Sequence, residues 1–176
     1  ASHPSSALAL QARLHCWGAP GVPASQALQM EASRITSRLY VGSAPDPFSV
    51  PSPYVPPVPV NTLILCAEEY QPHPGHFGDS GRGRPLRNIY RKGFADEWLD
   101  EIPPEAWGAA SIALRHLRRG DSVALTCIQG RNRSALVAAL VLYQRGDMSG
   151  REARLLVQHR RQAPRGATLS NKSFVM

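Results

Sequence analysis

Residues 122–143 read SVALTCIQGRNRSALVAALVLY. The opening residues, Ser122–Thr126, form a short apolar run of the kind found in a strand buried on both faces, and Ala135–Tyr143 form an apolar run typical of a buried helix. Between these runs, Cys127 stands where the strand ends and Arg133 stands six residues later, where the helix begins. The segment therefore predicts a strand, a loop and a helix, with a cysteine and an arginine at the two ends of the loop.

This loop has the properties of an anion site. Backbone N–H groups converge at a helix N-terminus and the helix dipole adds positive potential, so an anion binds there and a thiolate is stabilised. Gly130 lets the loop turn inward, and Arg133 presents a planar fork to phosphate oxygens. The residues expected to surround the phosphate are Ile128, Gln129, Gly130, Arg131, Asn132 and Arg133. The alternative is that Cys127 is a small core residue and Arg133 a solvated helix-start arginine.

Further strands and a helix precede this unit. A strand that runs into a turn is expected over Ile35–Val41, a fully buried strand over Thr62–Ala67, another strand over Arg87–Phe94, and a helix over Glu105–Arg119, ended by Gly120. Strands that alternate with helices indicate an α/β fold. We expect a central, mostly parallel, twisted sheet flanked by helices.

Two segments lie outside this pattern. Residues 1–33 hold helix candidates at Ser6–His15 and Ser25–Ala32, and are interpreted as an appendage to a domain of residues 34–176. In residues 45–59, seven of fifteen positions are proline, which favours an extended surface connection. Recognition of that segment by a groove for proline-rich peptides is the alternative.

Composition excludes several classes of protein. The 176 residues are 43% apolar, enough for a core. The stretch Leu39–Ala67 is interrupted repeatedly by proline, so it does not form the run of roughly 18–20 apolar residues that a membrane span needs. The N-terminus lacks the pattern of a signal peptide, so the expected location is the cytoplasm. The three cysteines lie far apart, and the loop histidines His73 and His76 offer too few ligands for a metal, so free thiols and no metal or cofactor are expected.

The residues around Cys127 resemble the dual-specificity branch of the cysteine-based protein tyrosine phosphatase superfamily. The family signature is His-Cys-x-x-Gly-x-x-Arg-Ser/Thr, and Cys127, Gly130, Arg133 and Ser134 match it. The resemblance covers about residues 35–175: residues 35–42 and 62–68 look like the family's first two strands, and residues 149–153 and 169–174 look like its closing helices. One departure is Thr126, which stands where the family has histidine. We expect its hydroxyl to bond the loop backbone and to limit the loss of thiolate stabilisation.

The resemblance implies a two-step phosphatase reaction with a cysteinyl-phosphate intermediate formed by Cys127. An aspartate on an upstream loop supplies a proton to the leaving oxygen, and Asp96 fits that position, with Asp100 in reserve. Ser134 would donate a hydrogen bond to the sulfur. The alternative for the acidic residues near Asp96 is a solvated turn before a helix.

The sequence is compatible with several classes of substrate. The first interpretation is a protein phosphatase acting on phosphotyrosine, phosphoserine and phosphothreonine. The net charge of +7, Arg131, and the cluster Arg115, Arg118 and Arg119 motivate a phosphoinositide phosphatase or an RNA 5′-triphosphatase as alternatives, although a helix carries that cluster and it could be a solvated face. A non-catalytic module that binds phosphorylated partners is a third interpretation, motivated by Thr126.

Overall fold

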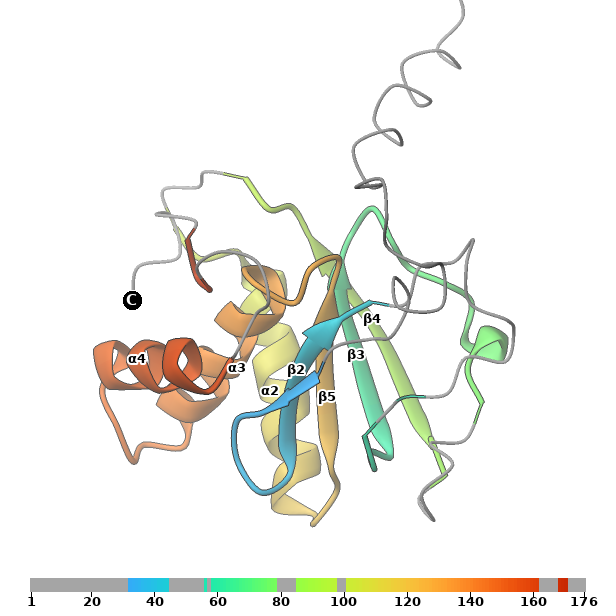
Figure 1. The fold of residues 1–176 in the computed structure, drawn as a ribbon, viewed down its shortest axis with the longest axis horizontal. Helices are drawn as coiled ribbons and strands as arrows, with labels where there is room; N and C mark the ends of the chain where they lie inside the picture. The colour runs from blue at the N-terminus through green and yellow to red at the C-terminus, as the bar shows by residue number, and fades with distance from the viewer. Residues whose placement is uncertain are drawn as a thin grey trace, which may run out of the picture.

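The structure is a computed structural model, and it describes residues 32–44, 56, 58–78, 85–97, 101–161 and 168–170. A five-stranded sheet forms its centre, in the order β1-β2-β5-β3-β4 (Figure 1). The strands are β1 (Ala32–Arg34), β2 (Leu39–Ser43), β3 (Thr62–Ala67), β4 (Asn88–Phe94) and β5 (Val123–Cys127). Only the β1–β2 pair is antiparallel, and β2, β5, β3 and β4 are parallel neighbours. The prediction of a mostly parallel α/β sheet is confirmed.

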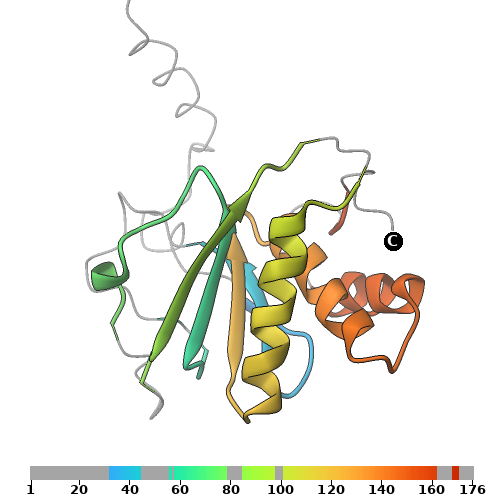
Figure 2. The ribbon, with the colours of Figure 1, turned by 180° about the vertical axis from the view of Figure 1, so that it is seen from behind.

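Three helices lie on one side of this sheet (Figures 1 and 2). They are α2 (Pro104–Arg118), α3 (Arg133–Gln144) and α4 (Gly150–Arg160), and a short 3-10 helix, η1, covers Pro74–His76. Helix α3 is buried from Arg133 to Leu142 because it packs against the sheet, against α2 and against α4. This position explains its apolar sequence, which shows no polar face.

The start of the sheet differs from the expected boundaries. The strand expected over 35–41 begins at Leu39, because residues 35–38 form the bend that joins β1 to β2. Ala32 and Ser33, expected in the appendage, belong to β1 and pair with β2. The helix candidate over 25–32 therefore cannot extend to Ala32; the rest of it, and the candidate over 6–15, lie outside the described residues.

Loops cover the second face of the sheet. A smaller apolar cluster there joins Tyr40, Val60, Leu63, Leu65 and Ala124 with Val58, Phe77, Leu86 and Ile89. Most of the proline-rich segment 45–59 lies outside the described residues, but Pro56 is buried and Val58 packs against this cluster. The end of that segment therefore belongs to the core and not only to a surface connection.

A network of polar side chains lies at the end of the sheet where the parallel strands begin. His116 of α2 is 4% exposed, and its Nδ1 lies 2.6 Å from Asp121 Oδ2. Its Nε2 lies 2.9 Å from the hydroxyl of Tyr90 in β4. Asn61 donates to the other carboxylate oxygen of Asp121 at 2.9 Å. The network links α2 to three strand ends, at the end of the sheet opposite Cys127.

Candidate active site

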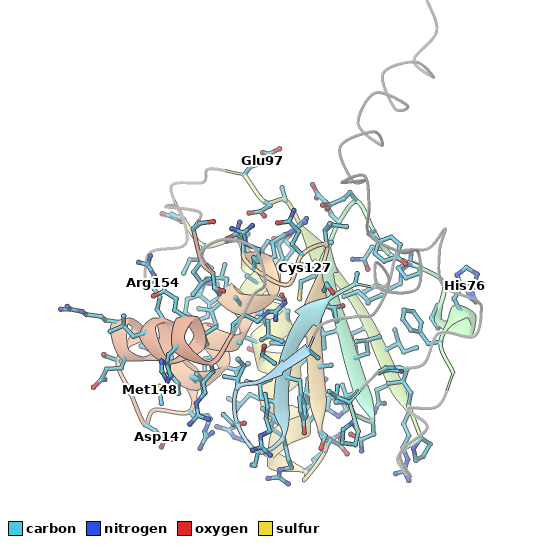
Figure 3. All side chains as sticks on the ribbon, viewed as in Figure 1. His76, Glu97, Cys127, Asp147, Met148 and Arg154 are labelled. Carbon is cyan, nitrogen blue, oxygen red and sulfur yellow. The ribbon has the colours of Figure 1, made fainter. Side chains whose placement is uncertain are left out.

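Cys127 is the last residue of β5, at the end of the sheet where the parallel strands finish (Figure 3). Cys127 is 2% exposed, and its carbonyl accepts a 2.6 Å hydrogen bond from Ala44 N–H. Residues 128–132 then form the loop, and Arg133 starts α3. The carboxyl edge of a parallel sheet, next to a helix N-terminus, is where open α/β sheets commonly bind ligands.

The side chain of Ser134 contacts that of Cys127. Its residue is fully buried, and its Oγ is 3.2 Å from Cys127 Sγ. A hydroxyl at this distance can donate a hydrogen bond to a thiolate, which stabilises the charged form. The structure therefore brings together the two groups that the signature pairs.

Arg133 is 3% exposed and is held by Glu69, which follows β3, and by the end of β4. Its Nη2 donates to Glu69 Oε1 at 2.5 Å, its Nη1 donates to Glu69 Oε2, and Nη1 also donates to the carbonyl of Phe94 at 3.2 Å. The remaining Nε is buried and has no hydrogen-bond partner in the structure. The two terminal nitrogens of the guanidinium, Nη1 and Nη2, are thus held in place, while its Nε–H is a donor without an acceptor.

Glu69 was not recognised in the sequence. It follows β3 by two residues, at the same edge of the sheet as Cys127, and that topological position is the signal that could have found it. Burial acts to raise the pKa of this half-exposed carboxyl, but the hydrogen bonds and the charge of Arg133 outweigh burial and hold the pKa below its ordinary value. Glu69 is therefore charged at neutral pH and paired with the arginine.

Asp96 lies beside the loop, two residues after β4. Asn132 Nδ2 donates to Asp96 Oδ2 at 3.2 Å, while Asn132 Oδ1 accepts from both N–H and Oγ of Ser170, at 3.1 and 3.2 Å. The side chain of Asn132, expected to surround the phosphate, thus joins the candidate acid to the C-terminal segment. Asp100, the reserve candidate, lies outside the described residues.

Gly130 is the residue that lets the loop approach β2. Its φ is +65°, and a Cβ atom there would stand 2.4 Å from the backbone carbon of Gly42. Ile128 packs against the larger apolar cluster, which lies between the sheet and the helices. Arg131 donates from Nη1 to Gln129 Oε1 at 3.3 Å. The phosphate-binding roles expected of these residues remain predictions.

Thr126 does not do what the sequence led us to expect. Its residue is 1% exposed, and its Oγ1 has no hydrogen-bond partner in the structure, so the hydroxyl does not bond the loop backbone. Thr126 belongs to β5 and not to the loop, and its backbone is paired with β2 and β3. Cys66 of β3 is fully buried beside the site, and burial first, then the neighbouring Cys127, raises the pKa of its thiol. Cys66 is thus a neutral core residue, and its thiol is free, as expected.

The loop histidines do not form a metal site. His73 accepts a 3.1 Å hydrogen bond from Gly75 N–H, and the described residues contain no group of histidine, cysteine, aspartate or glutamate that could hold a metal ion. The expectation that the protein needs no cofactor stays a prediction. Within the same described part, no helix is long and apolar enough to cross a membrane.

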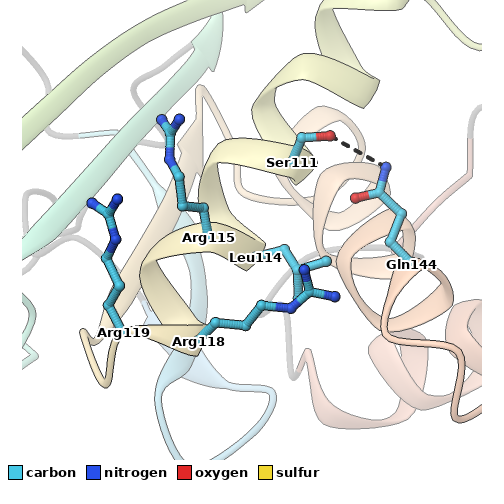
Figure 4. A pocket seen from close by; sticks show the side chains of 6 residues that line it. All are labelled: Ser111, Leu114, Arg115, Arg118, Arg119 and Gln144. Atoms are coloured by element: carbon cyan, nitrogen blue, oxygen red, sulfur yellow. Dashed lines mark hydrogen bonds between the residues drawn. The ribbon is translucent and has the colours of Figure 1, made fainter.

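The arginine cluster of α2 lines an open hollow between α2 and α3 (Figure 4). The hollow is lined by Ser111, Leu114, Arg115, Arg118, Arg119 and Gln144. These arginines lie in the last turn of α2 and just after it, next to the start of β5, whereas Cys127 ends β5. The cluster is therefore remote from the loop and does not line the candidate site.

The fold matches solved phosphatase structures. Human DUSP28 superposes with a TM-score of 0.60 at 18% identity, over 81% of this chain and 89% of that one. A mouse putative dual specificity phosphatase, complexed with zinc tungstate, gives 0.59 at 17% identity, over 89% and 86% of the two chains. The human tyrosine phosphatase-like serine/threonine/tyrosine-interacting protein gives 0.57 at 18% identity, over 82% and 90%.

No protein-family model and no curated protein sequence matches this chain. The chain has the fold of the dual-specificity branch of the cysteine-based protein tyrosine phosphatase superfamily, as its resemblance to that branch predicted. At these identities the likeness establishes the fold alone, so the chemistry has to be argued from the residues of the site.

Proposed function

We propose that this protein is a cysteine-dependent phosphatase that hydrolyses phosphomonoesters. The observation that carries the proposal is the arrangement around Cys127: a buried hydroxyl 3.2 Å from its sulfur, and the buried arginine Arg133, whose Nε has no partner. A phosphate in the loop would supply an acceptor for that donor, and a buried N–H without an acceptor is otherwise unfavourable. Glu69 engages the other end of the guanidinium, so it would orient the fork.

The reaction would proceed by two displacements. The Cys127 thiolate attacks phosphorus, the bond from phosphorus to the ester oxygen breaks, and Asp96 gives its proton to that oxygen. Water then attacks the cysteinyl-phosphate while Asp96 accepts one of its protons, and the sulfur leaves as a thiolate that Ser134 stabilises by a hydrogen bond. Arg133 and the loop amides bind the equatorial oxygens, where charge gathers in both transition states.

Hydrolysis of para-nitrophenyl phosphate tests the nucleophile. We expect turnover by the native protein and none by Cys127→Ser, with unchanged thermal unfolding. Cys66→Ser is the matched control, because it changes a thiol of the same core that this mechanism does not use. Turnover that survives in Cys127→Ser would refute the proposal.

The acid is tested with leaving groups of different basicity. Asp96→Asn should slow an alkyl phosphate far more than an aryl phosphate, because a poor leaving group depends more on the proton. Equal slowing of both substrates would remove Asp96 from this role.

Phosphorylated protein side chains are the proposed substrate class, with phosphotyrosine first. Phosphoinositides and RNA 5′ ends remain alternatives within the same chemistry. Of the features that motivated them, Arg131 lies in the loop, but the arginine cluster of α2 lies at the other end of the sheet. A turnover panel of phosphotyrosine and phosphothreonine peptides, phosphoinositides and triphosphorylated RNA separates these classes.

A non-catalytic phosphate-binding module is the second candidate. The observation that favours it is the buried Thr126 hydroxyl, which has no partner and so gives the loop none of the support expected beside the nucleophile. Binding of a phosphopeptide without any turnover of the panel would establish this function in place of catalysis.

A further inference from the structure

Arg161 follows the last turn of α4, and its side chain leaves that helix to reach the loop after Cys127. The residue is 3% exposed. Its Nε donates to the carbonyl of Gly130 at 2.8 Å, and its Nη2 donates to the carbonyl of Gln129 at 3.4 Å. Its Nη1 donates to Ser33 Oγ of β1 at 3.0 Å. Burying a guanidinium is unfavourable unless its donors are paired, and here two of them are paired with the loop backbone.

Leu169 holds the next carbonyl of the same loop. Its backbone N–H donates to the carbonyl of Arg131 at 2.9 Å. Leu169 is 2% exposed and has a φ of +55°, a left-handed conformation that residues with a side chain rarely adopt. Such a conformation persists only where the surrounding structure imposes it. Thr168 ties this segment to Arg161, because its Oγ1 donates to the Arg161 carbonyl at 3.4 Å.

The peptide bond connects these contacts to the phosphate site. In a planar trans peptide, the carbonyl of one residue and the N–H of the next point in opposite directions. Three consecutive carbonyls, those of Gln129, Gly130 and Arg131, are held by groups outside the loop. The N–H groups of residues 130–132 are therefore directed away from these outer groups.

We propose that Arg161 is a positioning residue for phosphate binding, which sets the direction of the loop amides by holding the carbonyls behind them. The Leu169 N–H completes the same function for the amide of Asn132. This inference rests on the proposed phosphatase function and extends it to residues about thirty positions after the loop. The Arg161 cation also adds positive potential behind the phosphate, although it does not touch the substrate.

The test uses the full chain and two measurements that do not require turnover. The first is the affinity for inorganic phosphate and for orthovanadate, measured by calorimetry. The second is the pH midpoint for alkylation of Cys127 by iodoacetamide, which reports how well the amides stabilise the thiolate. The variants are Arg161→Gln and Arg161→Lys, and the control is Ser33→Ala, which removes only the Arg161 contact that leads away from the loop.

We expect Arg161→Gln to lose about tenfold to a hundredfold in anion affinity, since small errors in geometry have effects of that order. Its alkylation midpoint should move to higher pH. Arg161→Lys should lie between Arg161→Gln and the native protein, because one ammonium cannot replace the fork at two carbonyls. Ser33→Ala should bind anions as the native protein does.

Each outcome is decisive. If Arg161→Gln does not fold, Arg161→Lys alone decides, and native affinity together with a native alkylation midpoint in that variant overturns the inference. A native protein that binds anions while both Arg161 variants bind equally well refutes the positioning role and leaves the phosphatase proposal standing. A native protein that neither binds these anions nor hydrolyses any phosphate overturns both proposals.

Discussion

Replacing Glu69 by glutamine should lower the free energy of unfolding by about 2 kcal/mol. A fully buried ion pair that loses one partner costs about 3–5 kcal/mol, whereas an exposed pair contributes at most about 1 kcal/mol. The pair in this protein is intermediate, because the Arg133 side chain is 4% exposed and the Glu69 side chain is 51% exposed. The glutamine keeps one acceptor for the guanidinium but loses the charge, so the effect should lie between those limits.

Urea unfolding at pH 7 measures this change, and a chain of this size should also lose about 4–8 °C in Tm. Glu68→Gln is the matched control, since it removes the same charge from an exposed neighbouring residue. The control should change the unfolding free energy by less than about 0.5 kcal/mol. The reasoning is refuted if Glu69→Gln and Glu68→Gln have the same stability.

The same pair gives a pH dependence with a definite sign. The pKa of Glu69 in the folded protein is below the ordinary value of 4.5, so the unfolded chain binds a proton at higher pH than the folded chain does. The stabilisation is therefore complete above about pH 4.5 and is lost as the pH falls through the folded pKa. The stability difference between the native protein and Glu69→Gln should be constant near neutral pH and should shrink in acid. A difference that grows in acid would contradict the pairing.

Three further predictions address the loop and the opposite end of the sheet. Asn132→Ala should slow alkyl phosphate hydrolysis by about tenfold and aryl phosphate hydrolysis much less, because Asp96 loses its hydrogen bond; equal slowing would contradict this role. Gly130→Ala should destabilise the fold far more than Gly146→Ala, by thermal unfolding, since both have positive φ but only the first Cβ meets backbone within 4 Å. Asp121→Asn should flatten the acid side of the stability profile, because the hydrogen bond with a buried histidine lowers the pKa of Asp121 below 3.8 and its stabilisation disappears as the pH falls; an unchanged profile would exclude that contribution.

Local sequence was sufficient for the four parallel strands and for the nucleophile loop, but it did not predict β1, which pairs with β2 at the edge of the sheet. The buried run of residues 62–67 coincides with β3, and the apolar run after Ser134 lies within α3, because burial on both faces leaves a continuous apolar pattern. Thr126 shows the limit of that reasoning. Its residue type suggested a hydroxyl bonded to the loop, but the direction of a side chain on a strand follows from the packing of the sheet.

The sequence by itself determined the strand, loop and helix around Cys127, because the helix start, the glycine and the arginine fall within eight residues. Only the tertiary structure decided what supports them. Glu69 precedes Arg133 by 64 positions, and Arg161 follows Gly130 by 31. No local pattern connects such distant residues. They meet because parallel strands end at one edge of the sheet and α4 packs against α3, which brings a carboxylate and a guanidinium to the same loop.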